Sequence, residues 1–436
     1  MSEPVTYAVV TFGCRVNQAE SLVIEGALLA RGATAVSPNE ASVVVVNTCS
    51  VTANADQAAR QTIRRIARAN PAVKVVVTGC YATRRPGEVT TLPNVVRVVP
   101  NARKDALTDA VAEDLGLTTA RRFGDGDGPC GSSLTPGTAG RTALTLRVQT
   151  GCGEACSYCI IPSTRGIGRS RPLRDVGRDV RRAVDAGYKE IVITGVHLGS
   201  YGRDLAEGSS LAALIRMLGD WSADVLFRIS SLEPMDCTPD IVEMVASSQR
   251  IAPHFHLPLQ HGSDAMLRAM RRPYTVPFYR ALIDRINTVL PQASVGSDII
   301  VGFPGETAAH FAEMRAVLEQ LPLTHLHVFP YSDRPGTDAS RLFPKVDGRE
   351  VRERGRETRA IGERMVRRFR ASQVGRTLRG LSVDDGRSIV TDNYLKLRLD
   401  RAQPRNQWVN VRVEQDQQAT VAEAGGTPFR LESTQK

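Results

Sequence analysis

The chain has 436 residues, of which 42% are hydrophobic and 23% are charged, and its formal net charge is +10. This length predicts two or three domains, and the composition excludes a disordered or fibrous protein. No run of 18 apolar residues occurs and the first residues lack a signal-peptide pattern, so we expect a cytoplasmic protein without a membrane partner. The positive charge favours a polyanionic partner, and solubility is the simpler alternative.

Residues 1–115 read as strands that alternate with helices. Three β-branched runs, at residues 7–10, 43–46 and 74–77, are too short for helices and are apolar on both faces. Helical patterns lie between them at residues 18–30 and 55–69. Because strands separated by helices need right-handed crossovers, this first domain is predicted to be a parallel α/β sheet of the Rossmann-like kind.

A cysteine follows each of these three strands: Cys14, Cys49 and Cys80. The carboxyl ends of parallel strands lie along one edge of a sheet, so the three thiols are predicted to converge there. Disulfides are disfavoured in a cytoplasmic protein, where clustered cysteines more often bind metal. We therefore predict a 4Fe–4S cluster with three protein ligands, and a buried packing role is the alternative for any one cysteine.

Residues 116–142 are predicted to be a linker, because they are rich in Gly, Ser and Pro and show no hydrophobic period. Cys130 lies in this segment, and nothing in the spacing gives it a partner. We leave Cys130 and Cys237, which is further along the chain, without an assigned role.

A second cysteine trio, Cys152, Cys156 and Cys159, lies on one loop with the spacing C-x3-C-x2-C. Three thiolates on so short a loop can bind three irons of a cubane 4Fe–4S cluster, which leaves the fourth iron open to another ligand. A zinc site would normally close with a fourth Cys or His, and the nearest His, His197, is far downstream. Zinc or a fortuitous grouping is the alternative.

From residue 143 to about 345 one unit repeats: a short apolar strand, a loop and a helix. Such units form a curved parallel sheet, and the loops after its strands gather at the carboxyl face. The cysteine loop follows the first strand, so its cluster is predicted to face the mouth of the sheet. The strands are predicted at residues 144–148, 190–194, 226–230, 254–257, 295–301 and 325–329.

Residues 346–372 form an Arg-rich helical pattern that closes the central domain, which is predicted to span residues 143–372. Arg and Glu at i,i+4 spacing support a solvated helix, and such a helix needs no further role. The excess of Arg nevertheless makes it a candidate arm for phosphate contacts.

Residues 373–436 change to period-two strands separated by turns, a pattern typical of a small antiparallel β-barrel, and end in a tail. An aromatic ring and positive charges on it are suited to stacking on bases and contacting phosphates. Tyr394 could also be a simple barrel-wall residue. The candidate RNA-binding residues are Tyr394, Lys396, Arg398 and Arg405.

The cysteine loop, with Tyr158 just before its last cysteine, resembles the signature of radical S-adenosylmethionine (SAM) enzymes. The stretch Thr11-Phe-Gly-Cys-Arg-Val-Asn-Gln-Ala-Glu-Ser21 is similar to the methylthiotransferase subfamily that acts on N6-threonylcarbamoyladenosine in tRNA. The isopentenyladenosine subfamily more often has Tyr-Gly-Cys-Gln-Met-Asn there. Residues 392–396 are similar to the core of the RNA-binding TRAM domain. Further segments that resemble the methylthiotransferase branch are residues 147–152, 159–172, 193–202, 258–264 and 298–307.

The resemblance implies a partial (β/α)6 barrel with two 4Fe–4S clusters, the auxiliary one on Cys14, Cys49 and Cys80. Residues at the ends of barrel strands become candidate SAM contacts. Carboxylate and amide side chains can bind its ammonium and ribose hydroxyl groups, and a glycine lets the backbone approach the ligand closely. The alternative for each residue is that it caps a helix or forms hydrogen bonds with the backbone of a loop. We expect His197, His256 and His261 to be pocket or packing residues. The candidate SAM contacts are Tyr158, Gly195, Glu233, Gln260, Gly302 and Glu306.

The implied reaction adds a methylthio group to C2 of the modified adenosine beside the anticodon of tRNA. An unactivated aromatic C–H offers no acid–base route at neutral pH, so the reaction needs a radical derived from SAM. No residue beyond the cluster ligands is assigned to catalysis. The implied partners are the anticodon stem-loop, an electron-donor protein and a sulfur source. The alternatives are a methylthiotransferase for isopentenyladenosine or for a ribosomal-protein aspartate, and a non-catalytic Fe–S or zinc protein that binds RNA.

Overall fold

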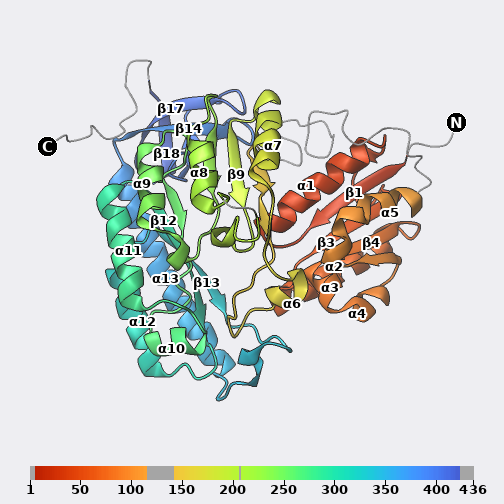
Figure 1. Cartoon of the computed structure of the whole chain (residues 1–436), viewed down its shortest axis with the longest axis horizontal. Coiled ribbons are helices and arrows are strands. Elements are labelled where there is room, and N and C mark those ends of the chain that lie inside the picture. Colours follow the sequence, from red (N-terminus) through yellow and green to blue (C-terminus); the bar gives the residue numbers. More distant parts are fainter. Residues whose placement is uncertain (1–4, 115–141, 206–207, 423–436) are drawn as a thin grey trace.

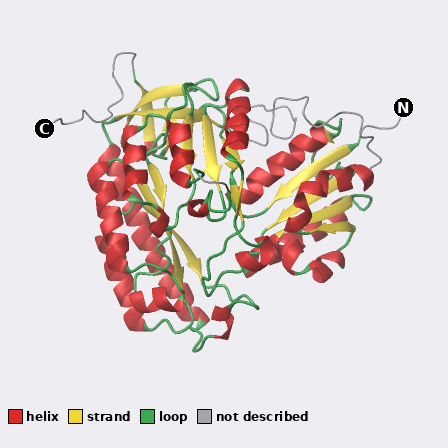
Figure 2. Cartoon of the chain, in the orientation of Figure 1, coloured by secondary structure: helices red, strands yellow, loops and turns green. Residues whose placement is uncertain are grey.

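The computed structural model describes residues 5–114, 142–205 and 208–422, which form three parts (Figure 1). An amino-terminal α/β sheet lies beside a central barrel of strands and helices, and a small β-barrel covers one end of the central part (Figure 2). The predicted linker, with Cys130, lies outside the described residues except for its last position. No described helix is both long and apolar enough to cross a membrane.

The first part is a five-stranded, all-parallel sheet in the order β2-β1-β3-β4-β5. The three predicted strands are confirmed, and the short β2 and the half-buried β5 are added at its edges. Pairing of Thr11 with Asn47 and of Asn47 with Thr78 aligns the ends of β1, β3 and β4 at one edge. The elements are β1 Thr6–Thr11, α1 Arg15–Leu29, β2 Thr34–Ala35, β3 Val43–Thr48, α2 Ala53–Ala69, β4 Lys74–Gly79, α3 Cys80–Arg84, α4 Pro86–Thr90, β5 Val95–Val99 and α5 Leu107–Asp114.

The central part contains the six predicted strands, each within one residue of its expected bounds. They form two three-stranded parallel sheets, β6-β9-β10 and β11-β12-β13, which meet where Phe227 forms a bridge with Ile251. This is the open barrel that the resemblance implied. The strands are β6 Leu144–Arg147, β9 Glu190–Thr194, β10 Leu226–Ile229, β11 His254–His256, β12 Ser294–Val301 and β13 His325–Pro330.

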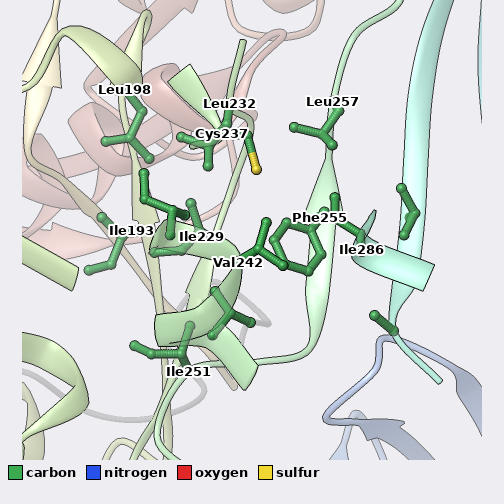
Figure 3. Close-up of a cluster of buried hydrophobic side chains, with 14 of the residues drawn as sticks. Ile193, Leu198, Ile229, Leu232, Cys237, Val242, Ile251, Phe255, Leu257 and Ile286 are labelled. Carbon is green, nitrogen blue, oxygen red and sulfur yellow. The ribbon is translucent and has the colours of Figure 1, made fainter. Parts of the chain in front are cut away.

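The two faces of the barrel wall differ because side chains alternate along each strand. Ile193, Ile229 and Phe255 point outward into a core shared with the surrounding helices (Figure 3). Cys237 is 3% exposed in this core, which gives that cysteine a packing role. The opposite side, which we call the inner face, is polar and carries Glu190, Arg228, His254, His256, Asp298, His325 and His327.

The Arg-rich segment forms α13, which is not simply a solvated arm. One side of α13 packs on β13, and Arg354, Thr358, Ile361 and Met365 are buried there. Solvated Arg–Glu pairs, such as Arg356 with Glu353, remain on the other side. The helices of the central part are α6 Ile161–Arg165, α7 Leu173–Asp185, α8 Leu211–Gly219, α9 Pro239–Ser247, α10 Asp264–Ala269, α11 Val276–Val289, α12 Ala308–Gln320 and α13 Gly348–Gln373; a hairpin pairs β7 Gln149–Thr150 with β8 Arg169–Ser170.

The third part is a closed barrel in the order β14-β15-β16-β18-β17. The predicted small β-barrel is confirmed, and its pairs are antiparallel except for β16 and β18, which pair in parallel. A closed ring with an odd number of strands cannot alternate direction throughout, so a five-stranded barrel needs at least one parallel pair. Its strands are β14 Thr377–Val383, β15 Ser388–Thr391, β16 Lys396–Leu399, β17 Trp408–Val413 and β18 Gln418–Val421.

Candidate active site

The structure brings Cys14, Cys49 and Cys80 together at the carboxyl edge of the first sheet. Cys14 is exposed and precedes α1, Cys49 follows β3, and Cys80 is the first residue of α3. Burial, together with the nearby negative charges of Cys14 and Cys80, raises the pKa of the Cys49 thiol to about 11. Gly13 has a φ of +88°, and a Cβ there would lie 2.6 Å from Cys49 Sγ, so only glycine allows this approach.

Cys152, Cys156 and Cys159 lie on the loop between β7 and α6. Burial raises the pKa of the Cys159 thiol to about 12, and the neighbouring thiolates Cys156 and Cys152 contribute in the same direction. The backbone amide of Glu154 lies 3.4 Å from Cys152 Sγ, as a donor to it. Gly151 closes the turn with a φ of +75°, where a Cβ would meet the carbonyl oxygen of Ile167 at 2.0 Å.

Both trios fit iron–sulfur clusters by the chemistry of their donors. None of the seven described cysteines forms a disulfide, although each trio is close enough for its thiols to influence one another electrostatically. Thiolates need either metal or hydrogen-bond donors when they are this crowded, because like charges repel. Three soft sulfur ligands, with no fourth cysteine grouped with them among the described residues, suit a 4Fe–4S cluster that keeps one iron open.

Arg272 is a contact of the second trio that the sequence analysis missed. Its Nη1 donates to Cys156 Sγ at 3.0 Å, and its Nη2 donates to the carboxylate of Glu233. The guanidinium is almost fully buried, so this charge is held beside the cysteine loop. Glu233, predicted as a SAM contact at the end of β10, is therefore oriented by an arginine that also donates to Cys156.

His197 is the other buried cation beside this loop. Its Nδ1 lies 3.8 Å from Cys152 Sγ, and its Nε2 lies 2.7 Å from Asp236 Oδ2. Burial favours the neutral imidazole, but the hydrogen bonds to Asp236 and Cys152 outweigh it and raise the pKa of His197 to about 9. His197 is thus a pocket residue that places a positive charge next to a cysteine.

A buried ion cluster connects the two trios. Glu20 of α1 accepts from Lys104 at 2.6 Å, from Arg147 at 2.8 Å and from Arg165 at 2.8 Å; we call these four residues the Glu20 cluster. Arg165 ends α6, the helix that follows Cys159, and Figure 1 shows α6 beside α3, which begins at Cys80.

Asn101 adds a second connection. Its amide nitrogen donates to the carbonyl oxygen of Thr164 at 2.9 Å and lies 3.6 Å from Cys80 Sγ. The helix that follows one trio is therefore fixed directly against the helix that carries a ligand of the other.

Three other predicted SAM contacts, two that follow barrel strands and one in the cysteine loop, have structural partners. A Cβ on Gly195 would lie 2.9 Å from Gln149 Oε1, so its small size serves a protein contact. Gln260 has a φ of +69° and joins β12 through its backbone. Tyr158, half-buried, packs against the cluster that contains Met270 and Phe303. Contact of these residues with SAM stays a prediction.

Glu306 is held inside the turn after β12. Its Oε2 accepts from the amides of Gly302 at 2.6 Å and Phe303 at 3.1 Å, and its Oε1 accepts from Arg354 at 2.7 Å. His261, fully buried, lies 3.7 Å from the same carboxylate. Burial raises the pKa of Glu306, but His261 and Arg354 outweigh it and hold that pKa below its usual range.

The four candidate RNA-binding residues lie in different surroundings. Tyr394 is 41% exposed, and its hydroxyl accepts a 2.8 Å hydrogen bond from Arg15 of α1. Lys396 pairs with Asp384, and Arg398 is exposed on the same strand. Arg405 donates to the hydroxyl of Thr142, so it also contacts the central part. Contact of these residues with RNA stays a prediction.

Comparisons with known proteins agree with this geometry. Residues 6–100 match the family model described as Uncharacterized protein family UPF0004, and residues 146–318 match the Radical SAM superfamily. Against the structure of the radical SAM methyltransferase TsrM from Kitasatospora setae, the TM-score is 0.56 at 15% identity, with 77% of each chain covered. That likeness concerns the fold alone.

Relatives at higher identity span nearly the whole chain. The threonylcarbamoyladenosine tRNA methylthiotransferase MtaB of Aquifex aeolicus is 35% identical over 89% of this chain and 95% of its own length. The MtaB protein of Bacillus subtilis is 34% identical over 90% of each chain. The tRNA-2-methylthio-N(6)-dimethylallyladenosine synthase of Thermobifida fusca is 32% identical over 86% of this chain and 77% of its own length. The chain is therefore an enzyme of the radical SAM methylthiotransferase family.

Proposed function

We propose that this protein adds a methylthio group to C2 of N6-threonylcarbamoyladenosine, next to the anticodon of tRNA. The observation that carries the proposal is that two cysteine trios, each suited to a 4Fe–4S cluster, are held against each other by α6 and the Glu20 cluster. Relatives of about one-third identity that carry this activity in their names support the choice of nucleoside.

Cys152, Cys156 and Cys159 hold the cluster that serves SAM. When SAM is bound there, it supplies a radical able to take hydrogen from an aromatic carbon. The protein's part is to orient and to shield: Arg272 and His197 place positive charge beside Cys156 and Cys152, and Arg272 fixes the carboxylate of Glu233.

Cys14, Cys49 and Cys80 hold the second cluster, which provides the sulfur that is transferred. Cys14, Cys49 and Cys80 would supply three of the four ligands that such a cluster can take, so one iron would be free to bind another group. In the Glu20 cluster three positive charges share one carboxylate, which leaves a net positive charge near this site. That positive charge stabilises thiolates and an anionic cluster there. An electron-donor protein and a source of sulfur are required as partners.

The anticodon stem-loop reaches the site beside the small β-barrel. This barrel carries Lys396 and Arg398 at exposed positions, which suits contact with phosphates. Tyr394 lies at the junction of all three parts, so RNA bound to the barrel would be adjacent to the trio at Cys14.

A direct test is to supply purified total tRNA and, separately, purified ribosomes to the reconstituted enzyme and to measure the mass gained. Nucleoside mass spectrometry of tRNA from cells that lack the protein should show N6-threonylcarbamoyladenosine without its methylthio group. Modification of isopentenyladenosine alone, or of ribosomal protein alone, would replace the proposed substrate. A protein that holds one cluster and forms no 5′-deoxyadenosine would be an RNA-binding protein and not an enzyme of this kind.

A further inference from the structure

Arg15 occupies a position between the first cysteine trio and the inner face of the barrel. It follows Cys14 directly, and its Nη2 donates to the Tyr394 hydroxyl at 2.8 Å. The Tyr394 ring centroid lies 4.7 Å from that of His254 on β11 and 4.8 Å from the guanidinium carbon of Arg228 on β10. The side chain of Arg15 thus reaches from the amino-terminal sheet to the polar interior of the barrel.

The charge of Arg15 is not neutralised within the described part of the chain. Its side chain contacts a phenol there and no carboxylate. Other cations near the site are engaged: Arg228 pairs with Glu190 and donates to the carbonyl oxygens of Thr391 and Asp392. Arg147 and Arg165 share Glu20. A half-buried arginine with a neutral partner can accept an anionic ligand without first breaking an ion pair.

The proposed substrate carries such an anion. A threonylcarbamoyl group ends in a free carboxylate, whereas an isopentenyl group is a neutral hydrocarbon. In adenine, C2 and C6 flank the same ring nitrogen, so a base whose C2 faces the trio at Cys14 holds its N6 substituent only a few ångströms away. The carboxylate of that substituent can then reach the residue that follows Cys14.

We propose that Arg15 determines specificity by binding the carboxylate of the threonylcarbamoyl group. This inference rests on the proposed function and adds the residue that reads the substituent. The fork of the guanidinium matches a carboxylate, and Tyr394 holds that fork over the inner face.

The test uses anticodon stem-loop RNA with N6-threonylcarbamoyladenosine, as the free acid or as its neutral methyl ester. For the wild-type enzyme, kcat/KM of methylthiolation should favour the acid. Arg15→Gln should lower kcat/KM for the acid about 10- to 100-fold and leave the ester unchanged, because one charge-assisted contact is lost. Arg15→Lys should keep most of the preference. Formation of 5′-deoxyadenosine without RNA should be unaffected in both variants.

Arg356→Gln, which removes an exposed positive charge from α13, is the matched control for general RNA affinity and should not alter the acid-to-ester ratio. An equal loss on acid and ester in Arg15→Gln, or no loss on either, overturns the inference. A wild-type enzyme that modifies neither RNA would instead overturn the proposed function, so the two failures are distinguishable.

Discussion

Arg165 of α6 donates hydrogen bonds to both carboxylate oxygens of Glu20 of α1, at 2.8 and 3.1 Å. The two residues are 145 positions apart in the sequence and belong to the two parts that carry the cysteine trios. Both side chains are at most 5% exposed. This buried pair, extended by Lys104 and Arg147, fixes the distance between the trios, on which any transfer between them depends.

Glu20→Gln should destabilise the protein by about 3–5 kcal/mol, because it leaves buried cations without their counter-charge. Thermal or urea unfolding of the variant and the wild type measures this loss. Glu88→Gln is the control: Glu88 also pairs with an arginine, Arg60, but is largely exposed, so its loss should cost less than about 1 kcal/mol. Equal losses of unfolding free energy in the two variants would show that the Glu20 cluster stabilises the protein no more than an exposed ion pair does.

Stability should also fall in acid because of Glu20. Burial opposes ionisation, but Lys104 and Arg165 outweigh it and hold the folded pKa of Glu20 well below its ordinary 4.5. A lowered pKa contributes stability that is complete above about pH 4.5 and is lost as the pH falls toward the folded pKa. Free energies of unfolding between pH 7 and pH 3 should therefore decline less steeply in Glu20→Gln than in the wild type. If the unfolding free energy falls equally steeply with pH in both proteins, the loss of stability in acid does not come from Glu20.

Cys14→Ala should separate the two activities. The substitution removes a ligand of the first trio only, so about half of the cluster iron should be lost, while SAM is still cleaved to 5′-deoxyadenosine. Methylthiolation of tRNA should be abolished. Iron content and product analysis on anaerobically reconstituted protein measure both. Cys156→Ala is the counterpart and should lose SAM cleavage as well; loss of cleavage in Cys14→Ala would contradict this division of roles.

Arg272→Gln should lower the reduction potential of the cluster held by the second trio. The hydrogen bond from Arg272 to Cys156 Sγ stabilises the more negative, reduced cluster, so its loss disfavours reduction and slows SAM cleavage several-fold. Redox titration followed by electron paramagnetic resonance measures the shift. Arg271→Gln removes a neighbouring exposed arginine paired with Asp338 and should leave the potential unchanged. If the reduction potential of Arg272→Gln equals that of the wild type, Arg272 has only a packing role.

Arg354→Met should cost about 3–5 kcal/mol of stability, since it leaves the fully buried carboxylate of Glu306 without its cation. That carboxylate also holds the amides of the turn at Gly302, so the end of β12 should loosen. Hydrogen exchange of this turn and chemical unfolding measure the effect. Arg356→Met, on the exposed side of the same helix, should change stability by no more than about 0.5 kcal/mol.

The sequence alone was sufficient to predict the main helices and strands and the convergence of the cysteines. Cys14, Cys49 and Cys80 each follow a β-branched run, and parallel topology places such positions on one edge, which the structure shows. Cys152, Cys156 and Cys159 meet because they share a loop. These are local or topological constraints, which a periodic pattern and a short spacing express directly.

Only the tertiary structure decided what surrounds those cysteines. Arg272 reaches Cys156 from 116 positions away, and Arg15 reaches Tyr394 from 379 positions away. No spacing or period marks such pairs, because they depend on how separately folded parts pack. The same holds for Glu306 and Gly195, whose motif positions suggested ligand contacts but whose side chain or missing Cβ is used by protein neighbours. Patterns along the chain determine elements and clusters, whereas long-range packing determines the charges and hydrogen bonds that control them.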